Sequence, residues 1–309
     1  MQSVETAIKT EGLSKTFKGK KGTQVNALIG LNLEIQKGEI FGFLGPNGAG
    51  KSTTIKLIMG LIRPTSGSFS VLGLTVSSDE YKKHIGYLPE NPSYYDYLTA
   101  EELLHFVGST FSMETTEIEQ NSEHLLKTLD IYESRKRPIK SYSKGMLQRL
   151  GLAQALIHDP EIFVLDEPMS GLDPIGRILV RNLILELKSK GKAVFMSTHI
   201  LNDIETICDR VGIIINGELK RIVKIKDILE KDIISYDITF SSTNNEPEIL
   251  NTFKGQFSKR VDTFNLKILP QDLTKILSNI SKDKDITLHL IQPERKGLEH
   301  LFTEIINEK

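Results

Sequence analysis

The chain has 309 residues, of which 39% are hydrophobic and 26% are charged, and its formal net charge is −1. This length accommodates one large domain and a small one, and the composition is typical of globular proteins. The balanced charge disfavours a partner selected by charge alone, such as nucleic acid or an anionic lipid surface. The single cysteine, Cys208, excludes an internal disulfide and is interpreted as a packing residue. No apolar run approaches the roughly 18 residues that span a bilayer, so a role at a membrane would require another chain to provide the spans.

Three short, continuous apolar runs each end abruptly in polar residues. Residues 40–44 precede a glycine-rich loop, residues 162–165 precede an Asp-Glu pair, and residues 193–196 precede a Ser-Thr-His segment. Continuous apolar character predicts strands that are buried on both faces of a parallel sheet. Because ligands bind beyond the carboxyl ends of such strands, we expect the three polar segments to converge at one edge. The fold class predicted for this part of the chain is therefore α/β.

A helical insert is predicted between the first and second of these strands, over residues 91–155. Thr99 and Glu102 have the spacing of a capping box and precede apolar residues at helical spacing. A second helix is predicted over residues 122–129, and a third follows Ser143.

The character of the sequence changes near residue 220, from buried strands to mixed strands and polar loops. We therefore predict an α/β domain over residues 4–220 and a small C-terminal α+β domain over residues 221–309. No recognisable chemistry lies in the second region, for which packing or support of a dimer is the simplest expectation.

Residues 45–53 match the phosphate-binding pattern of Gly, four residues, and Gly-Lys-[Ser/Thr]. Glycines allow backbone N–H groups to close around phosphate oxygens, and the helix that follows directs its positive end at the same anion. Lys51 is expected to reach the β- and γ-phosphates of ATP, and Ser52 to coordinate Mg²⁺. A chance glycine-rich turn is disfavoured because the loop follows a strand and opens a helix. The predicted binding residues are Gly45, Pro46, Asn47, Gly48, Ala49, Gly50, Lys51, Ser52 and Thr53.

Asp166, Glu167 and His199 are the candidate catalytic and metal-binding side chains at the same edge. Asp166 is expected to hold Mg²⁺, usually through water, and Glu167 to orient or deprotonate a water for attack on the γ-phosphate. His199 can donate a hydrogen bond to the developing negative charge, and with Lys51 and Glu167 it completes the predicted catalytic set. Without the phosphate loop, an Asp-Glu pair at a strand end would be interpreted as a solvated turn.

The motifs and their order resemble the ATPase subunit of an ABC transporter, over roughly residues 4–220. Besides the phosphate loop, the Asp-Glu pair and His199, they are Gly86-Tyr87-Leu88-Pro89-Glu90, Tyr142-Ser143-Lys144-Gly145-Met146 and Ser170-Gly171-Leu172-Asp173. The resemblance implies a P-loop NTPase core of the ABC type and a head-to-tail dimer with two ATP molecules between the subunits. It leaves open whether the second subunit is identical.

The resemblance also implies roles for residues outside the phosphate loop. Ser143 and Gly145 would reach the ATP bound by the other subunit, although Ser143 alone would be interpreted as a helix cap. Glu90 and Asp173 match nucleotide-site positions. Phe17 matches an aromatic position that stacks on adenine, although a phenylalanine by itself is more often part of a core.

Two departures from the usual family pattern occur. The signature-like segment carries Lys144 and Met146, and Glu90 replaces the usual glutamine, so a role copied from glutamine is uncertain there. Both variants resemble the exporter branch whose permeases handle drugs, polysaccharides, lipids or antibiotics. The resemblance therefore implies a partner permease in the membrane, with this chain at its cytoplasmic face and no nucleic-acid partner.

The permease is expected to contact the insert near Glu90, Tyr94, Tyr95 and Tyr97, with local packing of the tyrosines as the alternative. One rival function is a soluble ABC ATPase acting on nucleic acid or ribosomes. This is disfavoured by the single cassette, the short insert and the balanced charge. A second rival, a regulatory module that binds nucleotide without hydrolysis, is disfavoured by Glu167 and His199 together.

Overall fold

The computed structural model describes residues 5–19, 23–75, 79–229, 233–243, 256–260, 263–295 and 297–307. The chain divides into two compact units, Met1–Ile225 and Lys226–Lys309. The expected domain boundary at residues 220 and 221 falls within β10 (Glu218–Lys224), which pairs antiparallel with β9 (Arg210–Ile215) and so extends a sheet of the first unit. The outer boundaries expected at residues 4 and 309 lie outside the described residues.

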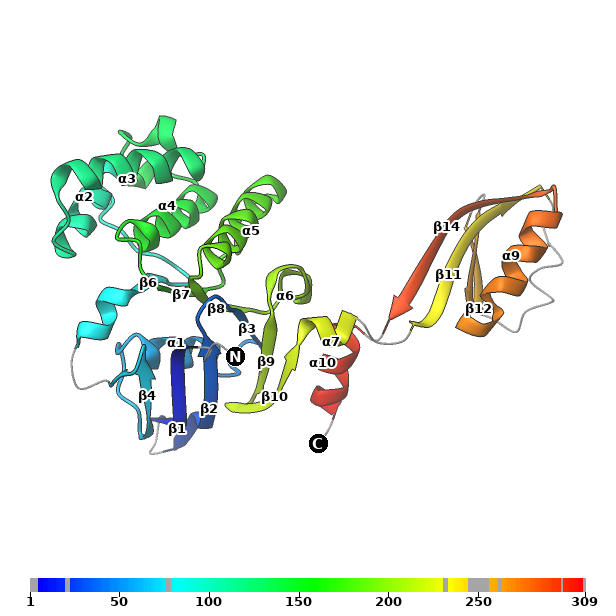
Figure 1. Cartoon of the computed structure of the whole chain (residues 1–309), viewed down its shortest axis with the longest axis horizontal. Helices are drawn as coiled ribbons and strands as arrows, with labels where there is room; N and C mark the ends of the chain where they lie inside the picture. Colours follow the sequence, from blue (N-terminus) through cyan, green and yellow to red (C-terminus); the bar gives the residue numbers. More distant parts are fainter. Residues whose placement is uncertain are drawn as a thin grey trace. The chain divides into compact units, whose positions relative to one another are not determined.

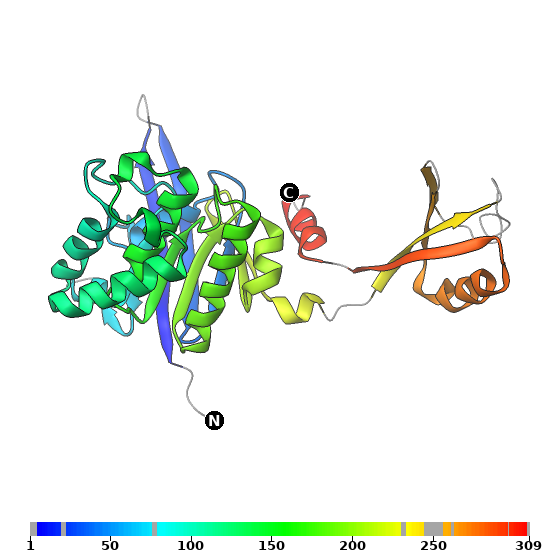
Figure 2. The same ribbon diagram turned by 90° about the horizontal axis from the view of Figure 1, so that it is seen from above.

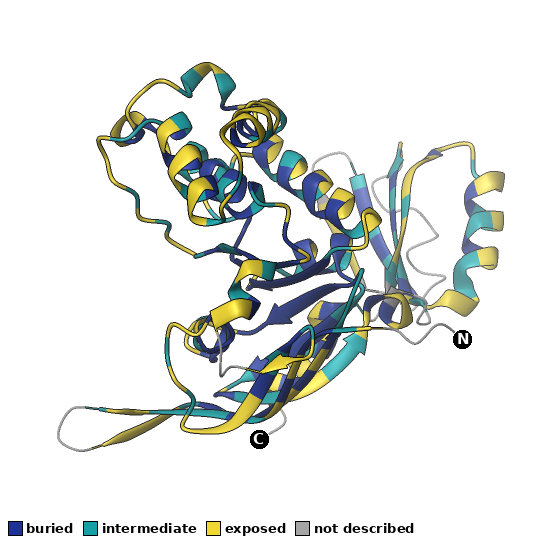
Figure 3. Ribbon diagram, turned by 60° about the vertical axis from the view of Figure 1, so that its left-hand side comes forward, coloured by how far each residue is buried: buried dark blue, intermediate teal, exposed yellow. Residues whose placement is uncertain are grey.

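A six-stranded sheet forms the centre of the first unit, in the order β10-β9-β3-β8-β7-β6. All of its neighbouring strands are parallel except the β10–β9 pair. The three predicted strands are β3 (Ile40–Leu44), β7 (Ile162–Asp166) and β8 (Ala193–Thr198), and every residue in them is buried (Figure 3). The prediction of doubly buried parallel strands is therefore confirmed. The remaining strand of this sheet is β6 (Ile85–Leu88).

One face of this sheet packs against α1 (Lys51–Ile58) and a four-stranded antiparallel sheet (Figure 1). Phe41, Phe43 and Phe195 meet in this layer, with ring centroids 5.5 and 6.2 Å apart. Burial of such rings is a large favourable contribution to stability. The strands of the antiparallel sheet are β1 (Thr6–Lys18), β2 (Gln24–Gln36), β4 (Ser66–Val71) and β5 (Leu74–Thr75), in the order β2-β1-β4-β5.

The opposite face is covered by α5 (Pro174–Ser189) and α6 (Leu201–Ile207). A Cβ at Gly42 of β3 would lie 2.3 Å from Ile204 Cδ1 and 2.9 Å from Cys208 Sγ. The glycine therefore lets α6 approach the strand closely. Cys208 is buried here, as the packing interpretation requires.

The helical insert contains α2 (Ala100–Thr110), α3 (Thr115–Thr128) and α4 (Lys144–Leu156). The predicted capping box at the start of α2 is present, since Thr99 N donates to Glu102 Oε2 at 2.8 Å and Glu102 N donates to Thr99 Oγ1 at 3.2 Å. The prediction for α3 was wrong at its start, because the first two turns are mostly polar and carry little apolar periodicity. Short 3₁₀ turns are η2 (Asp79–His84), η3 (Tyr132–Ser134) and η4 (Ile139–Ser141).

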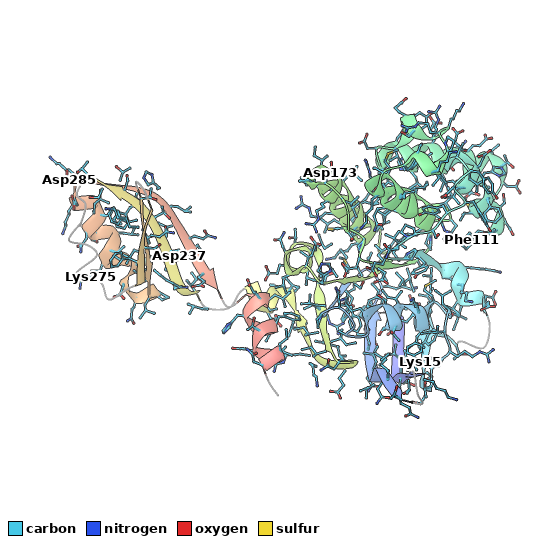
Figure 4. The ribbon with its side chains drawn as sticks, turned by 180° about the vertical axis from the view of Figure 1, so that it is seen from behind. Lys15, Phe111, Asp173, Asp237, Lys275 and Asp285 are labelled. Atoms are coloured by element: carbon cyan, nitrogen blue, oxygen red, sulfur yellow. The ribbon has the colours of Figure 1, made fainter. Side chains whose placement is uncertain are left out.

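The second unit is an α+β fold in which α9 (Leu273–Lys282) packs against one face of an antiparallel sheet (Figure 2). Phe240 and Phe264 stack at 5.4 Å in its core. Lys275 of α9 and Asp237 of the sheet are labelled in Figure 4. Its sheet order is β12-β13-β11-β14, with β11 (Ile233–Ser242), β12 (Gln256–Arg260), β13 (Thr263–Ile268) and β14 (Ile286–Arg295). The other helical segments are α7 (Ile225–Leu229), η5 (Pro270–Asp272) and α10 (Leu298–Asn307).

In the ranges that the structure describes, every helix is too short or too polar to span a lipid bilayer.

Candidate active site

A cavity of about 280 Å³ lies where the phosphate loop meets the segments that follow β6, β7 and β8. The predicted convergence of polar residues from separate strands is therefore present in the structure. The cavity is lined by Asn47, Gly48, Gly50, Lys51, Ser52, Thr53, Glu90, Glu167, Ser170 and His199.

The phosphate loop joins β3 to α1 and is held against neighbouring backbone. A Cβ at Gly45 would lie 2.4 Å from the carbonyl oxygen of Ile214, and one at Gly50 would lie 2.6 Å from that of Ala27. Gly48 and Gly50 have φ values of 80° and 111°, which side chains rarely tolerate. The glycines therefore allow the loop to turn tightly and to bring backbone N–H groups of the first turn of α1 to the cavity, an arrangement that suits phosphate.

Lys51 places its ammonium group across this loop. Its Nζ donates to the carbonyl oxygens of Gly45 at 2.7 Å and Pro46 at 3.3 Å. Burial lowers the pKa of Lys51, while the carboxylates of Glu167 and Asp166 act in the opposite direction. The cation is thus held beside the loop, at the cavity wall, where a phosphate chain would be neutralised.

Glu167 has a strained backbone that is fixed by its neighbours. Its φ is 53°, in the left-handed region that costs a residue other than glycine roughly 1–3 kcal/mol. Its N–H donates to the carbonyl and to the hydroxyl of Ser197, at 3.2 and 3.1 Å. Its carboxylate Oε1 lies 2.9 Å from Nδ1 of His199. This backbone conformation therefore directs a largely buried carboxylate to the cavity, with the imidazole of His199 beside it.

Asp166, the preceding residue, ends β7 and is buried. Its Oδ1 accepts a hydrogen bond from the hydroxyl of Ser197, so that one serine contacts both consecutive acidic residues. Asp166 does not line the cavity, whereas Ser52 does. Within the described residues no group of three or more His, Cys, Asp or Glu side chains is arranged to hold a metal ion by itself. An oxygen set of one hydroxyl and one carboxylate fits Mg²⁺, which usually retains waters and binds phosphate oxygens.

Within the phosphate loop, Gly45, Pro46 and Ala49 do not line the cavity. Four predicted binding residues from other segments also lie outside it. Ser143 is exposed and caps α4, accepting from Met146 N at 3.3 Å, and Gly145 follows in the first turn. Asp173 caps α5, where its Oδ1 accepts from Gly176 N at 2.8 Å (Figure 4). Phe17 is 39% exposed on β1, and the ammonium of Lys15 lies 5.1 Å from its ring centroid. None of these four contributes to the cavity formed by this chain alone.

Two contacts near the site were not predicted from the sequence. The amide nitrogen of Gln148 donates to the carbonyl oxygens of Glu167 and Pro168, both at 3.2 Å. Arg177 of α5 pairs with Asp203 of α6 at 3.3 Å, two residues after the start of α6. Gln148 stands next to Arg149 in a mostly apolar stretch of α4, and nothing in the sequence indicated its partners.

Residues 28–170 match the family model described as ABC transporter. The whole chain is 36% identical to an uncharacterized ABC transporter ATP-binding protein of Nostoc sp., all4389, and covers 92% of that protein. The chain belongs to the ATP-binding subunits of ABC transporters. Its predicted fold class and family resemblance are confirmed.

Other ABC proteins are similar over the first unit. The bacitracin transport ATP-binding protein BcrA of Bacillus licheniformis is 40% identical over 70% of this chain and 69% of its own length. A structure described as the ATP-binding subunit of an ABC transporter is 32% identical, with a TM-score of 0.66, over 72% of this chain and 91% of the other.

A dimeric, post-hydrolysis structure of the cassette MJ0796, bound to ADP and Pi, is 27% identical with the same TM-score. It covers 71% of this chain and 98% of the other. This ABC chain is therefore an ATPase that binds adenine nucleotides.

Proposed function

We propose that this ABC ATPase works as a head-to-tail dimer that couples ATP binding and hydrolysis to a separate membrane permease. The observation that carries the proposal is the conformation of Glu167, whose strained backbone directs a carboxylate to the cavity of the phosphate loop, with His199 at 2.9 Å. A protein that only senses nucleotide has no need to hold an acid in this conformation. The geometry therefore favours hydrolysis over the regulatory alternative.

The residues of the cavity divide into three roles. The backbone of residues 45–53 and the Lys51 ammonium bind the phosphates. Ser52, and Asp166 through water, would hold Mg²⁺, which would supply positive charge to the phosphate oxygens. Glu167 orients or deprotonates the attacking water. Glu90 lines the cavity, where its carboxylate is available to this metal site or to a water.

His199 orients Glu167 and is available to the γ-phosphate. Because an ionised carboxylate only accepts hydrogen bonds, the proton between them belongs to Nδ1 of His199. Its Nε2 then donates to phosphate only when the ring carries both protons. Electrostatic stabilisation of the γ-phosphate by His199 is thus a property of the imidazolium form.

A second subunit would complete the site. Ser143 is exposed at the N-terminus of the 13-residue helix α4, and neither Ser143 nor Gly145 lines the cavity of its own chain. A helix N-terminus with an exposed hydroxyl and a glycine suits the γ-phosphate of an ATP bound by another subunit. We place Asp173 and Phe17 at the same composite site, and a homodimer is the simplest arrangement.

The permease is proposed to contact the helical insert at exposed aromatic and acidic residues. Tyr95 and Tyr97 are 62% and 73% exposed, with ring centroids 5.8 Å apart. Tyr94 packs locally, since its hydroxyl lies 3.5 Å from the carbonyl of Leu147 and burial raises its pKa. Local packing therefore applies to Tyr94, whereas Tyr95 and Tyr97 are available to a partner.

A larger cavity of about 700 Å³ lies in the insert, away from the phosphate loop. Its wall carries four glutamates against one arginine, and its apolar part includes Phe106, which is 58% exposed. This composition suits a basic, amphipathic cytoplasmic segment of the permease. The similarity to BcrA, which is named for bacitracin transport, supports a transport role. We propose export from the Glu90 and signature-like variants, with this chain at the cytoplasmic face of the membrane.

Turnover and association test this function separately. Glu167→Gln should retain ATP binding and reduce turnover by about 10²–10⁴-fold, the range of general acid–base contributions. Glu205→Gln, on α6 and outside the cavity, makes the same substitution at a control position. Normal hydrolysis by Glu167→Gln would remove Glu167 from its role. Cross-linking through Tyr97, followed by purification from membranes, should recover an integral-membrane permease; recovery only with ribosomes or nucleic acid would overturn the transporter proposal.

A further inference from the structure

Gln148 is buried in α4, with 2% of its surface exposed, and both of its hydrogen bonds go to the segment that follows β7. The acceptors are the consecutive carbonyl oxygens of Glu167 and Pro168, each 3.2 Å from Nε2. Because both acceptors are carbonyls, the NH₂ group of the side chain must face them. The sequence separation between Gln148 and these acceptors is 19 and 20 residues, so the contact depends on how α4 packs over the sheet.

Hydrogen bonds from two different elements therefore hold the peptide groups on either side of Glu167. Ser197 of β8 accepts from the N–H of Glu167, and Gln148 of α4 donates to its carbonyl. Between these two contacts the φ angle of 53° is fixed. A left-handed residue of this kind persists only when its surroundings determine it. The Glu167 carbonyl also accepts from Ser170 N at 3.0 Å within the same turn, so without Gln148 only this local contact would hold the carbonyl side.

We propose that Gln148 is a positioning residue for ATP hydrolysis, which holds the backbone of Glu167 in the conformation that directs its carboxylate to the cavity. This inference rests on the proposed role of Glu167. It also connects α4, which Ser143 caps, to the catalytic carboxylate of the same chain. Gln148 itself does not line the cavity and is not a catalytic residue.

Gln148→Met tests the proposal, because methionine has a similar length but cannot donate to either carbonyl. We expect kcat to fall about 10- to 100-fold, since small displacements of a catalytic group have effects of this size. The KM for ATP and the affinity for a fluorescent ATP analogue should change less than about threefold, because the phosphate loop is untouched. Gln154→Met, on the same helix, is the matched control and should retain wild-type turnover.

Gln148→Asn provides a second variant in case the methionine protein does not fold. It keeps the amide on a side chain that is one methylene shorter, so we expect a partial loss of kcat. Thermal unfolding of each variant identifies loss of folded protein. A reduction in turnover that tracks only the folded fraction would overturn the positioning role.

A double-mutant cycle gives the decisive readout. If Gln148 acts through the carboxylate, Gln148→Met should reduce single-turnover hydrolysis by less than about twofold when Glu167→Gln is already present. A further 10- to 100-fold loss in that background would show that Gln148 acts elsewhere. Full activity of Gln148→Met beside an inactive Glu167→Gln would overturn this inference alone. Normal activity of Glu167→Gln would instead overturn the proposed function.

Discussion

The pair between Arg177 and Asp203 connects the helix that follows the Ser170–Asp173 segment to the helix that follows His199. Arg177 lies one turn into α5, and Asp203 lies near the start of α6, with 3.3 Å between their charged atoms. The Asp203 side chain is 8% exposed and that of Arg177 is 36% exposed. Replacing Arg177 with methionine would leave the carboxylate largely buried without its partner.

The expected loss of stability in Arg177→Met follows from the partial burial of the pair. Breaking a buried pair by removing one partner costs about 3–5 kcal/mol, whereas exposed pairs contribute about 0–1 kcal/mol. Because Arg177 is partly exposed, we expect Arg177→Met to cost about 2 kcal/mol at neutral pH. For a unit of this size, that lowers the unfolding midpoint by about 4–8 °C. ATP turnover should fall several-fold, because α6 positions the segment that carries His199.

The pH dependence of the loss of stability in Arg177→Met identifies its origin. Burial already raises the pKa of Asp203 above the ordinary value of 3.8, and Arg177 opposes that shift. Without Arg177 the folded-state pKa would rise further, so the folded protein would bind a proton more tightly than the unfolded chain. Stability is then lost as the pH rises from about 4 through the folded-state pKa. The difference from wild type should therefore be small near pH 4 and full near pH 8.

Thermal unfolding between pH 4 and pH 8, followed by circular dichroism, measures this effect. Arg181→Met, on the same helix, serves as the control and should show no comparable pH dependence. Arg177→Met/Asp203→Asn should recover most of the lost stability, because it removes the uncompensated charge. A cost that is independent of pH, or that persists in the double variant, would refute the reasoning.

Two further predictions concern close packing around the phosphate loop and α6. Gly45→Ala should destabilise the nucleotide-free protein by about 1–3 kcal/mol in urea unfolding, because its Cβ would lie 2.4 Å from the Ile214 carbonyl oxygen. Gly145→Ala, whose φ is not positive and whose Cβ would lie no closer than 3.6 Å to a neighbouring atom, should cost less, and equal costs would contradict this account. Burial raises the pKa of the Cys208 thiol, so a thiol reagent should label it only on unfolding; rapid labelling of the native protein would contradict its burial.

The buried strands were predictable because their signal is local. Continuous apolar runs identified β3, β7 and β8, and the edge rule for parallel sheets brought the segments after them together, as the cavity shows. The first turns of α3 were missed because helix formation there depends on a few apolar residues such as Ile118 packing into the insert. Local patterning indicates which face is apolar, but not where a mostly polar helix begins.

Contacts that depend on the packing of distant elements were not predictable. The hydrogen bonds of Gln148 require α4 to lie over the end of β7, and the Arg177–Asp203 pair requires α5 beside α6. The spacing of motifs along the sequence predicts neither of these packing arrangements. Ser143 and Phe17 illustrate the same limit in another way, because their expected role needs a second subunit and their own chain leaves them outside the cavity.

In the proposed cycle, ATP closes two of these chains into a dimer with composite sites. Sedimentation of Glu167→Gln with Mg-ATP tests it most directly, because a hydrolysis-deficient site would trap the closed state. Glu167→Gln/Ser143→Asp is the matched control: aspartate can still cap α4, but its charge would repel the phosphate. The account predicts an ATP-dependent dimer for Glu167→Gln and a monomer for the double variant. A Glu167→Gln protein that binds ATP yet remains monomeric would contradict it.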